Sequence, residues 1–346
     1  MESLRPLNRA GFTDVLDYGV SLFKKHFRKI FFISLVFNLP VTILLSIFNP
    51  VLTNQYMTFM NPDEITGSGD ILSSVLALYA MIIGGLLLSG IYNLTLKNVM
   101  DGSIIKILYA DVVLNQEKTP GQVIRECFKQ FGTMMLGRFL YGLIQSLVFF
   151  VAYILLVIGI FAGSFAFMGT AAAGFTSSSP WLAAGIIILG ILAAMTALFF
   201  LVVVTGYFNG RYWMFLPAIC IEQHKAGSGI GRCNKLGGNG FYLIGLSYIA
   251  GALLIWIFPG IINIVILFAS GVSGNMNVEL YRIGTVVTQI FSAVLQPLFV
   301  CILTALYIIL RVRREGLDLE IDLWTIKEEE KRKTQRWTME APNAAE

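Results

Sequence analysis

Residues 138–163 read RFLYGLIQSLVFFVAYILLVIGIFAG, and no charged side chain follows Arg138 within this stretch. A helix needs about 20 predominantly apolar residues to cross the hydrocarbon core of a bilayer. Five other stretches satisfy this condition, and none of the six contains an acidic residue. The other five are 30–52, 72–96, 182–207, 242–269 and 285–310. The sequence therefore predicts an all-α integral membrane protein with six transmembrane helices.

The composition supports the same class. Of the 346 residues, 56% are hydrophobic and 13% are charged, and the mean hydropathy is +0.73. Charged residues make up about a quarter of an average soluble domain. These values exclude an ordinary soluble fold. The basic residues lie next to apolar stretches rather than in one patch, so we expect contact with anionic lipid and none with nucleic acid.

The positions of the basic residues predict the orientation in the membrane. Twenty-four of the 25 Lys and Arg fall in the four segments 1–29, 97–138, 211–235 and 311–336. These segments alternate with loops that carry almost no Lys or Arg. Because basic loops stay on the cytoplasmic side, we expect both the N-terminus and the C-terminus in the cytoplasm.

The cytoplasmic segments before the first, third and fifth spans share a design. In the first segment, apolar residues recur every three or four positions, which places them on one face of a helix. They are Phe12, Leu16, Val20, Phe23, Phe27 and Ile30. In the second segment, Thr119 is a predicted N-cap, with Pro120 at the first helical position and Gln122 completing a capping box.

The third segment aligns with the second. Placing Cys233 on Cys127 also places Lys235 on Lys129 and Gly238 on Gly132. We expect three amphipathic elbow helices, each lying in the cytoplasmic interface and turning into a span, and hence a threefold repeat of helical hairpins. Simple anchoring and topology are the more common role of such segments, and binding of lipid or a partner is the less common one.

Cations on or beside these segments are the predicted contacts for lipid headgroups. They are Lys24, Lys25, Arg28, Lys29, Arg125, Lys129, Arg138, Arg211, Arg232 and Lys235. Neutral polar residues within the spans could line a pore or bind a solute, although such residues more often form hydrogen bonds between helices. They are Asn38, Gln145, Asn263, Gln289 and Gln296.

The chain lacks the residue patterns of the common catalytic and metal sites. It has two histidines, His26 and His224, and no acidic cluster beside them. No phosphate-binding loop and no nucleophile elbow occurs. We therefore expect no catalytic residues, no metal and no cofactor.

The membrane domain is expected to cover residues 1–324 and a charged, partly disordered cytoplasmic tail residues 325–346. Before the tail, apolar and acidic residues alternate from Leu317 to Leu323. This alternation predicts an extended amphipathic strip.

Residues 209–241 resemble the membrane-domain family first described in glycerophosphoryl diester phosphodiesterases. The family has a span that ends in R-x-x-x-x-x-P-x-x-x-x-E, which Arg211, Pro217 and Glu222 match. Residues 5–27 are similar to the opening elbow of the family, and residues 310–319 to the segment after its last span.

The next part of the family pattern, A-L-x-R-S-W-x-L-x-x-G, is matched by Arg232 and Leu236, and Gly238 stands one position before the glycine of the pattern. The usual Ser-Trp pair is replaced here by Cys233 and Asn234. The resemblance implies a stand-alone bacterial membrane protein, because neither the catalytic barrel of about 250 residues nor its His-Arg-Gly motif is present.

Taken together, these features predict a non-enzymatic, multi-pass protein of the bacterial plasma membrane. We expect a scaffold or accessory subunit that binds anionic lipid at its cytoplasmic face, with a membrane protein or a second copy of the chain as a further partner. The alternative is a permease or exporter of a small apolar or lipid-like solute, in which the Asn and Gln side chains of the spans form the site.

Overall fold

The computed structural model describes the chain over residues 9–60, 68–176, 180–238, 240–271 and 278–323, together with 326–327 and 330. Regular structure within these ranges is helical, and they contain no strand. The predicted cytoplasmic tail, 325–346, lies almost entirely outside the described residues.

The described helices divide into two groups by length. The short helices are α1 (Phe12–Lys25), α4 (Leu96–Val112), α5 (Pro120–Lys129), α8 (Phe215–Cys220) and α9 (Ala226–Gly237). The long helices are α2 (Phe27–Met60), α3 (Ser68–Leu94), α6 (Phe131–Thr176), α7 (Pro180–Trp213), α10 (Phe241–Gly271) and α11 (Val278–Glu315).

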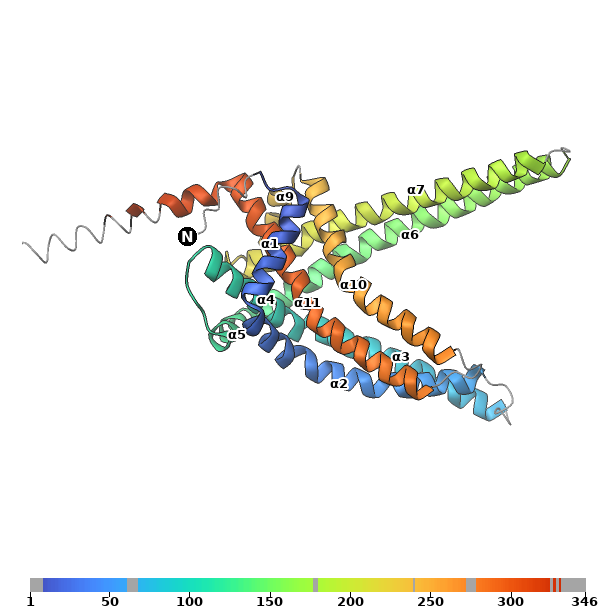
Figure 1. Cartoon of the computed structure of the whole chain (residues 1–346), viewed down its shortest axis with the longest axis horizontal. Coiled ribbons are helices and arrows are strands. Elements are labelled where there is room, and N and C mark those ends of the chain that lie inside the picture. The colour runs from blue at the N-terminus through green and yellow to red at the C-terminus, as the bar shows by residue number, and fades with distance from the viewer. Residues whose placement is uncertain are drawn as a thin grey trace, which may run out of the picture.

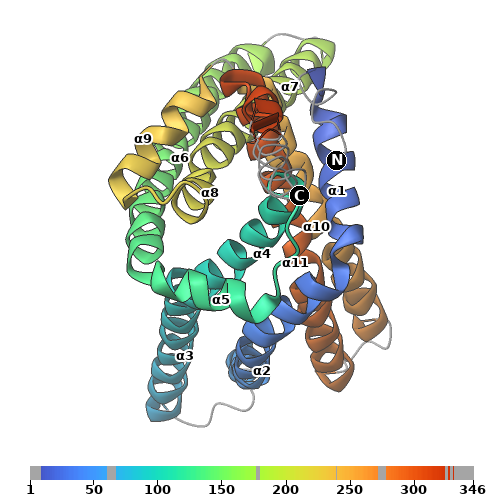
Figure 2. The ribbon, with the colours of Figure 1, turned by 90° about the vertical axis from the view of Figure 1, so that its left-hand side faces the viewer.

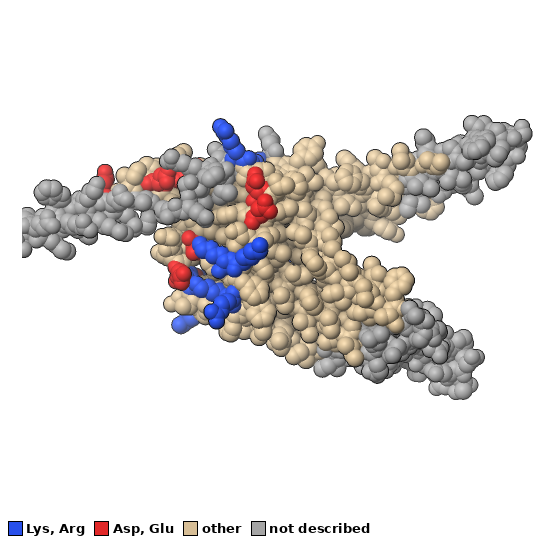
Figure 3. All heavy atoms as spheres, viewed as in Figure 1, with Lys and Arg blue, Asp and Glu red and all other residues tan. Residues whose placement is uncertain are grey.

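The short helices gather at one end of the molecule, and the long helices leave that end as two arms (Figure 1). One arm is the hairpin of α6 and α7. The other contains α2, α3, α10 and α11. Figure 2, viewed from the short-helix end, shows α1, α4, α5, α8 and α9 in front of the long helices. The space-filling view shows an open notch between the arms (Figure 3).

Helix α11 is the centre of the core. Its residues from Val300 to Leu310 are all buried, and Tyr307 is among the largest fully buried side chains. In its most apolar 18-residue window, within Val286–Glu315, 67% of the residues are buried, whereas no residue of α6 from Gly142 to Gly159 is buried. Helix α11 is therefore surrounded by protein, and α6 presents apolar side chains that a bilayer would cover.

Five segments of the described chain are long and apolar enough to cross a membrane. They are Phe27–Leu44, Ile82–Val112, Phe131–Gly159, Phe241–Ile266 and Val286–Glu315. Their length and composition support a multi-pass membrane protein. The remaining predicted span, 182–207, lies in α7, where many side chains are not described, so the count of six spans stays a prediction.

A helix occupies each segment that was predicted to form an elbow. In α1, Asp14 accepts a hydrogen bond from the Gly11 N–H at 2.6 Å, and Lys24 and Lys25 occupy the last turn. Both charge placements suit the helix dipole. In α5, the Thr119 N–H donates to Gln122 Oε1 at 3.4 Å, as the predicted capping box requires. Whether these helices lie in a membrane interface stays a prediction.

Two local predictions are wrong. The chain stays helical beyond the predicted ends of the spans 30–52 and 138–163, because α2 continues to Met60 and α6 to Thr176. Residues 164–176 contain no proline and three consecutive alanines, which favour helix. The strip from Leu317 to Leu323 is helical rather than extended, since Gly316 O accepts hydrogen bonds from the N–H groups of Leu319 and Glu320 and begins a new turn.

Candidate functional site

Exposed cations gather at the short-helix end of the molecule. Figure 3 shows Lys and Arg on this end, while the described parts of the arms carry none on the same face. Five of the predicted lipid contacts are exposed and form no ion pair with a carboxylate that the structure describes. We call these five the cationic collar: Lys24, Arg28, Arg125, Lys129 and Lys235.

Exposed aromatic side chains lie on the same helices as the collar. Phe12 on α1 is 38% exposed, Phe27 at the start of α2 is 41% exposed and Phe128 on α5 is 48% exposed. The side of α1 that packs into the core is a different one, formed by Val15, Gly19 and Leu22. Of the predicted apolar face, Phe12 and Phe27 are exposed, whereas Leu16 and Phe23 pack against the core and Ile30 is buried. Basic and aromatic side chains on one short helix are typical of an interfacial helix.

Two predicted lipid contacts are instead paired with carboxylates. Lys25 Nζ lies 2.6 Å from Asp111 Oδ2, and Lys29 Nζ lies 3.4 Å from Glu117 Oε2. His26, which separates α1 from α2, is buried and places Nε2 3.0 Å from the same Asp111 oxygen. These contacts fix the turn between α1 and α2 to the end of α4.

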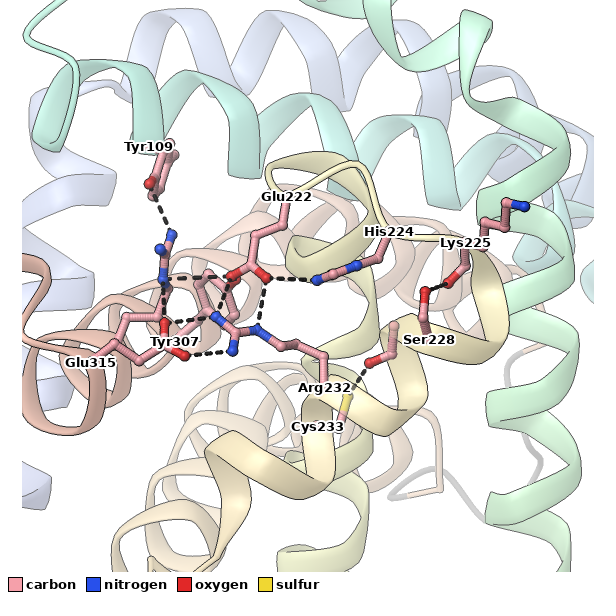
Figure 4. A network of polar contacts seen from close by, with 11 residues as sticks. Tyr109, Glu222, His224, Lys225, Ser228, Arg232, Cys233, Tyr307 and Glu315 are labelled. Carbon is pink, nitrogen blue, oxygen red and sulfur yellow. Dashed lines mark hydrogen bonds and ion pairs between the residues drawn. The ribbon is translucent and has the colours of Figure 1, made fainter.

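A network centred on Glu222 holds another predicted lipid contact, Arg232 (Figure 4). Arg232 Nε donates to Glu222 Oε2 at 2.7 Å, and its Nη2 donates to Glu315 Oε2 at 2.6 Å. The Tyr307 hydroxyl donates to Glu222 Oε1 at 2.5 Å, and Arg311 Nε lies 3.5 Å from that oxygen. These contacts join the loop after α8 to α9 and to the C-terminal end of α11.

The network extends to both sides. His224 Nε2 lies 3.1 Å from Glu222 Oε2, and Arg311 Nη1 donates to the Tyr109 hydroxyl of α4 at 2.9 Å.

Burial alone would raise the pKa of the Glu222 carboxyl, but hydrogen bonds from Arg232 and Tyr307 outweigh burial and lower it. The same bonds overcome the opposite effect of burial on Arg232 and raise its pKa. Both groups are therefore charged and engaged with each other.

Arg211 also serves the protein's own packing. Its Nη1 donates to the Tyr207 hydroxyl at 2.8 Å, and its Nη2 donates to the carbonyl of Asn234 in α9 at 3.3 Å. A Cβ added at Gly237 would lie 2.7 Å from Arg211 Cγ, so the side chain passes directly over this glycine. Arg211 therefore ties the end of α7 to the end of α9.

The neutral polar residues of the long helices do not form one site. Asn38 is buried, donates to Ser34 Oγ at 2.9 Å and to the Ala293 carbonyl of α11 at 3.3 Å, and also accepts from the Tyr92 hydroxyl of α3. Asn263 Oδ1 accepts a hydrogen bond from the Thr288 hydroxyl at 3.2 Å, and this bond joins α10 to α11. The two asparagines thus make contacts between helices.

The three glutamines do not join the asparagines around one common position. Gln145 lies on the separate arm of α6, while Gln289 and Gln296 lie on α11 with partly buried side chains. Because Gln145 is on the other arm from the asparagines and α11, the five predicted residues are not gathered around a single solute position (Figure 1).

A buried charged cluster was missed by the sequence analysis. Asn98 and Asp101 in the first turns of α4 are 0% and 1% exposed. Lys97 and Arg138, the latter from α6, lie close enough to interact electrostatically with Asp101. We had placed residues 97–138 in one cytoplasmic segment. The apolar character of residues 99–110, nearly all buried, was the signal that α4 belongs to the core.

The described cysteines and histidines are not gathered into a metal site. Within that part of the chain, no group of three or more His, Cys, Asp or Glu side chains could hold a metal ion. The four cysteines are buried and free. Burial raises the pKa of the Cys233 thiol to about 12, which keeps it protonated and unreactive.

Comparison of the chain with protein-family models, curated proteins and solved structures finds no match. The site must therefore be interpreted from its own geometry.

Proposed function

We propose that this protein is a non-enzymatic scaffold or accessory subunit of the bacterial plasma membrane that binds anionic lipid through the cationic collar. In this proposal six helices cross the bilayer, α1, α5 and α9 lie in the cytoplasmic interface, and both termini are cytoplasmic. The partner of the scaffold is a membrane protein or a second copy of the chain.

The observation that carries the proposal is the position of the unpaired cations. Each collar residue lies on a short helix or in the first turn of the long helix that follows it. Each basic side chain near an anionic membrane surface contributes about 1 kcal/mol of attraction, so five contribute up to about 5 kcal/mol. Exposed aromatics beside them, such as Phe27 and Phe128, add apolar contact with the acyl chains.

The alternative of a permease with an Asn- and Gln-lined site is not favoured. Asn38 and Asn263 use their polar atoms for contacts between helices. A solute that took these hydrogen bonds would have to compensate for the helix contacts it broke.

The contacts of the motif residues support membership of the phosphodiesterase membrane-domain family. Glu222 from the first part of the family pattern pairs with Arg232 from the second part. Arg311 and Glu315, from the segment that resembles the end of the family domain, join the same network. Three separate pieces of the resemblance thus meet at one place, which gives the motif residues a shared structural role.

The test is lipid retention by a collar variant. All five collar residues are changed to Gln, and the protein is purified in nanodiscs that contain phosphatidylcholine and phosphatidylglycerol. The control exchanges Lys for Arg and Arg for Lys at the same positions, which keeps every charge. We expect native mass spectrometry to show an enrichment of phosphatidylglycerol that falls about tenfold in the Gln variant, equivalent to about 1.4 kcal/mol, and is kept in the control. Equal enrichment in both variants would contradict the proposal.

A further inference from the structure

The buried cluster at the start of α4 has polar atoms that the protein leaves unpartnered. Asn98 Oδ1, Asp101 Oδ1 and Arg138 Nη1 are buried, and none forms a hydrogen bond within the described structure. The Asn98 side-chain amide donates to the Leu94 carbonyl at 2.8 Å, which leaves its oxygen as the free acceptor. Buried polar groups are nearly always hydrogen-bonded, so three unpartnered atoms in one cluster indicate a ligand.

The cluster supplies a defined chemistry. It presents two acceptor oxygens, from Asn98 and Asp101, and one guanidinium donor, from Arg138. Lys97 adds a second cation that interacts with Asp101 and Arg138. The basic side chains favour an anionic group, and the two acceptor oxygens favour hydrogen-bond donors beside it.

The depth of the cluster suits the headgroup region of the cytoplasmic leaflet. Arg138 lies seven residues after the first residue of α6, or about 10 Å along the helix at 1.5 Å per residue. The collar residues Arg125 and Lys129 lie on α5, directly before α6. The cluster therefore lies up to about 10 Å deeper than the collar when α5 lies in the interface, near the level where the headgroups meet the acyl chains.

Exposed apolar side chains lie close in sequence to the cluster on both arms. Ile91 near the end of α3 is 61% exposed, and on α6 Phe139 is 51% and Leu143 is 53% exposed. Helix α3 belongs to one arm and α6 to the other (Figure 1). An amphiphile held at the cluster would thus find apolar surface for its acyl chains on both helices.

We propose that the cluster formed by Lys97, Asn98, Asp101 and Arg138 binds the headgroup of one phosphatidylglycerol molecule. The phosphodiester accepts from Arg138 and faces Lys97, and the two headgroup hydroxyls donate to Asp101 Oδ1 and Asn98 Oδ1. This assignment gives a hydrogen-bond partner to each of the three unpartnered atoms of the cluster. It deepens the proposed function and relies on it only for the crossing of the membrane by these helices.

The first comparison uses two lipids on the unchanged protein. Phosphatidylglycerol and phosphatidylmethanol carry the same phosphodiester charge, but only phosphatidylglycerol has the two hydroxyls. We expect native mass spectrometry of delipidated protein to show one tight phosphatidylglycerol, bound at least tenfold more tightly than phosphatidylmethanol. Phosphatidylethanolamine, whose ammonium group adds a positive charge to the site, is expected to bind more weakly still. Equal affinity for the first two lipids would overturn the proposal.

The second comparison uses variants. Asp101→Asn removes the charge but keeps an acceptor, and should reduce the preference for phosphatidylglycerol over phosphatidylmethanol to about threefold or less. Arg138→Lys keeps the charge but loses the planar donor, and should weaken both lipids about tenfold. The control, Lys118→Gln, changes a cation that is paired with Glu126 at 2.9 Å and should leave the tight site unchanged. Unchanged affinity in both Asp101→Asn and Arg138→Lys would also overturn the proposal.

Lipid binding at the buried cluster can be distinguished experimentally from lipid binding at the cationic collar. The five-residue collar variant should lose weakly held anionic lipids and keep the single tight phosphatidylglycerol. Loss of the tight lipid in the collar variant, with no effect of Arg138→Lys, would place the tight site at the collar and reject the buried cluster. Tight binding that depends on Arg138, without any effect of the collar variant, would support the cluster and reject the collar.

Discussion

The pair of Glu222 and Arg232 should stabilise the fold rather than bind lipid. The two side chains are 12% and 20% exposed and share two hydrogen bonds, at 2.7 and 3.1 Å. Removing one partner of a fully buried ion pair costs about 3–5 kcal/mol. Because Arg232 is one-fifth exposed and Glu222 keeps Tyr307 and Arg311, we expect each single change to destabilise the protein by about 2 kcal/mol.

A double-mutant cycle with Glu222→Gln and Arg232→Met isolates the interaction. Unfolding is followed in mixed micelles by the fluorescence of tryptophan, which includes the buried Trp213. We expect a coupling free energy of about 1.5 kcal/mol. The matched cycle, Lys25→Met with Asp111→Asn, concerns a pair at 2.6 Å whose lysine is 58% exposed, and should couple by less than about 1 kcal/mol.

Two results would refute this reasoning. One is a coupling for Glu222 and Arg232 that does not exceed that of the exposed control pair. The other is a loss of phosphatidylglycerol from Arg232→Met, at conditions where the variant is folded, as large as the loss from the collar variant. The latter would restore Arg232 to the set of lipid contacts that the sequence predicted.

Three further predictions test the packing, the charge state and the polar contacts. Gly19→Ala should destabilise the protein by about 2 kcal/mol, because the new Cβ would lie 2.6 Å from the Ile302 Cα of α11. The control Gly231→Ala adds a Cβ with nothing within 4 Å and should stabilise the protein by about 0.5–1 kcal/mol. Equal effects of the two substitutions on stability would contradict the close contact between α1 and α11. The pKa of Glu222 is lowered in the folded protein from its ordinary 4.5, so its stabilising effect is present above pH 4.5 and is lost as the pH falls through the folded value. The melting temperature should therefore fall more steeply on acidification below pH 4.5 in the unchanged protein than in Glu222→Gln, and parallel curves would oppose this. Asn38→Leu should cost about 1 kcal/mol of unfolding free energy through its lost helix contacts. Loss of a bound small solute in this variant, without loss of stability, would argue against a purely structural role.

Local sequence properties were sufficient to predict most of the helices. Residues 138–163 form part of one helix because twenty apolar residues leave the backbone no other way to satisfy its hydrogen bonds in a bilayer. The start of α5 was predictable because Thr119 caps it together with Gln122, which is only three positions away in the sequence. Helix ends such as Met60 and Thr176 were not predicted, since small and apolar residues continue a helix as readily as they form a loop.

The candidate site was only partly predictable, because pairing depends on distant residues. Lys24 and Arg232 have the same charge and lie on similar amphipathic segments, so the sequence gives both the same role. Arg232 meets Glu315, which is 83 positions away, only when α9 packs beside α11. Lys24 meets no carboxylate in the described structure. Tertiary contacts, rather than local pattern, separate the anchors from the collar.

Asp101 shows why the depth of a charge matters as much as its sign. In the sequence, Lys97 and Arg138 fall in the same basic segment as Arg125 and Lys129 of the collar. In the structure, both interact with the carboxylate of Asp101, which is only 1% exposed. Attraction between exposed charges is screened over about 8 Å at physiological ionic strength, whereas buried pairs are screened much less. Lipid held by the collar should therefore be released by salt, and lipid held by direct hydrogen bonds at the buried cluster should remain. The two groups of cations are thus chemically distinct sites, although Arg125 and Lys129 of the collar share one basic segment of the sequence with Lys97 and Arg138.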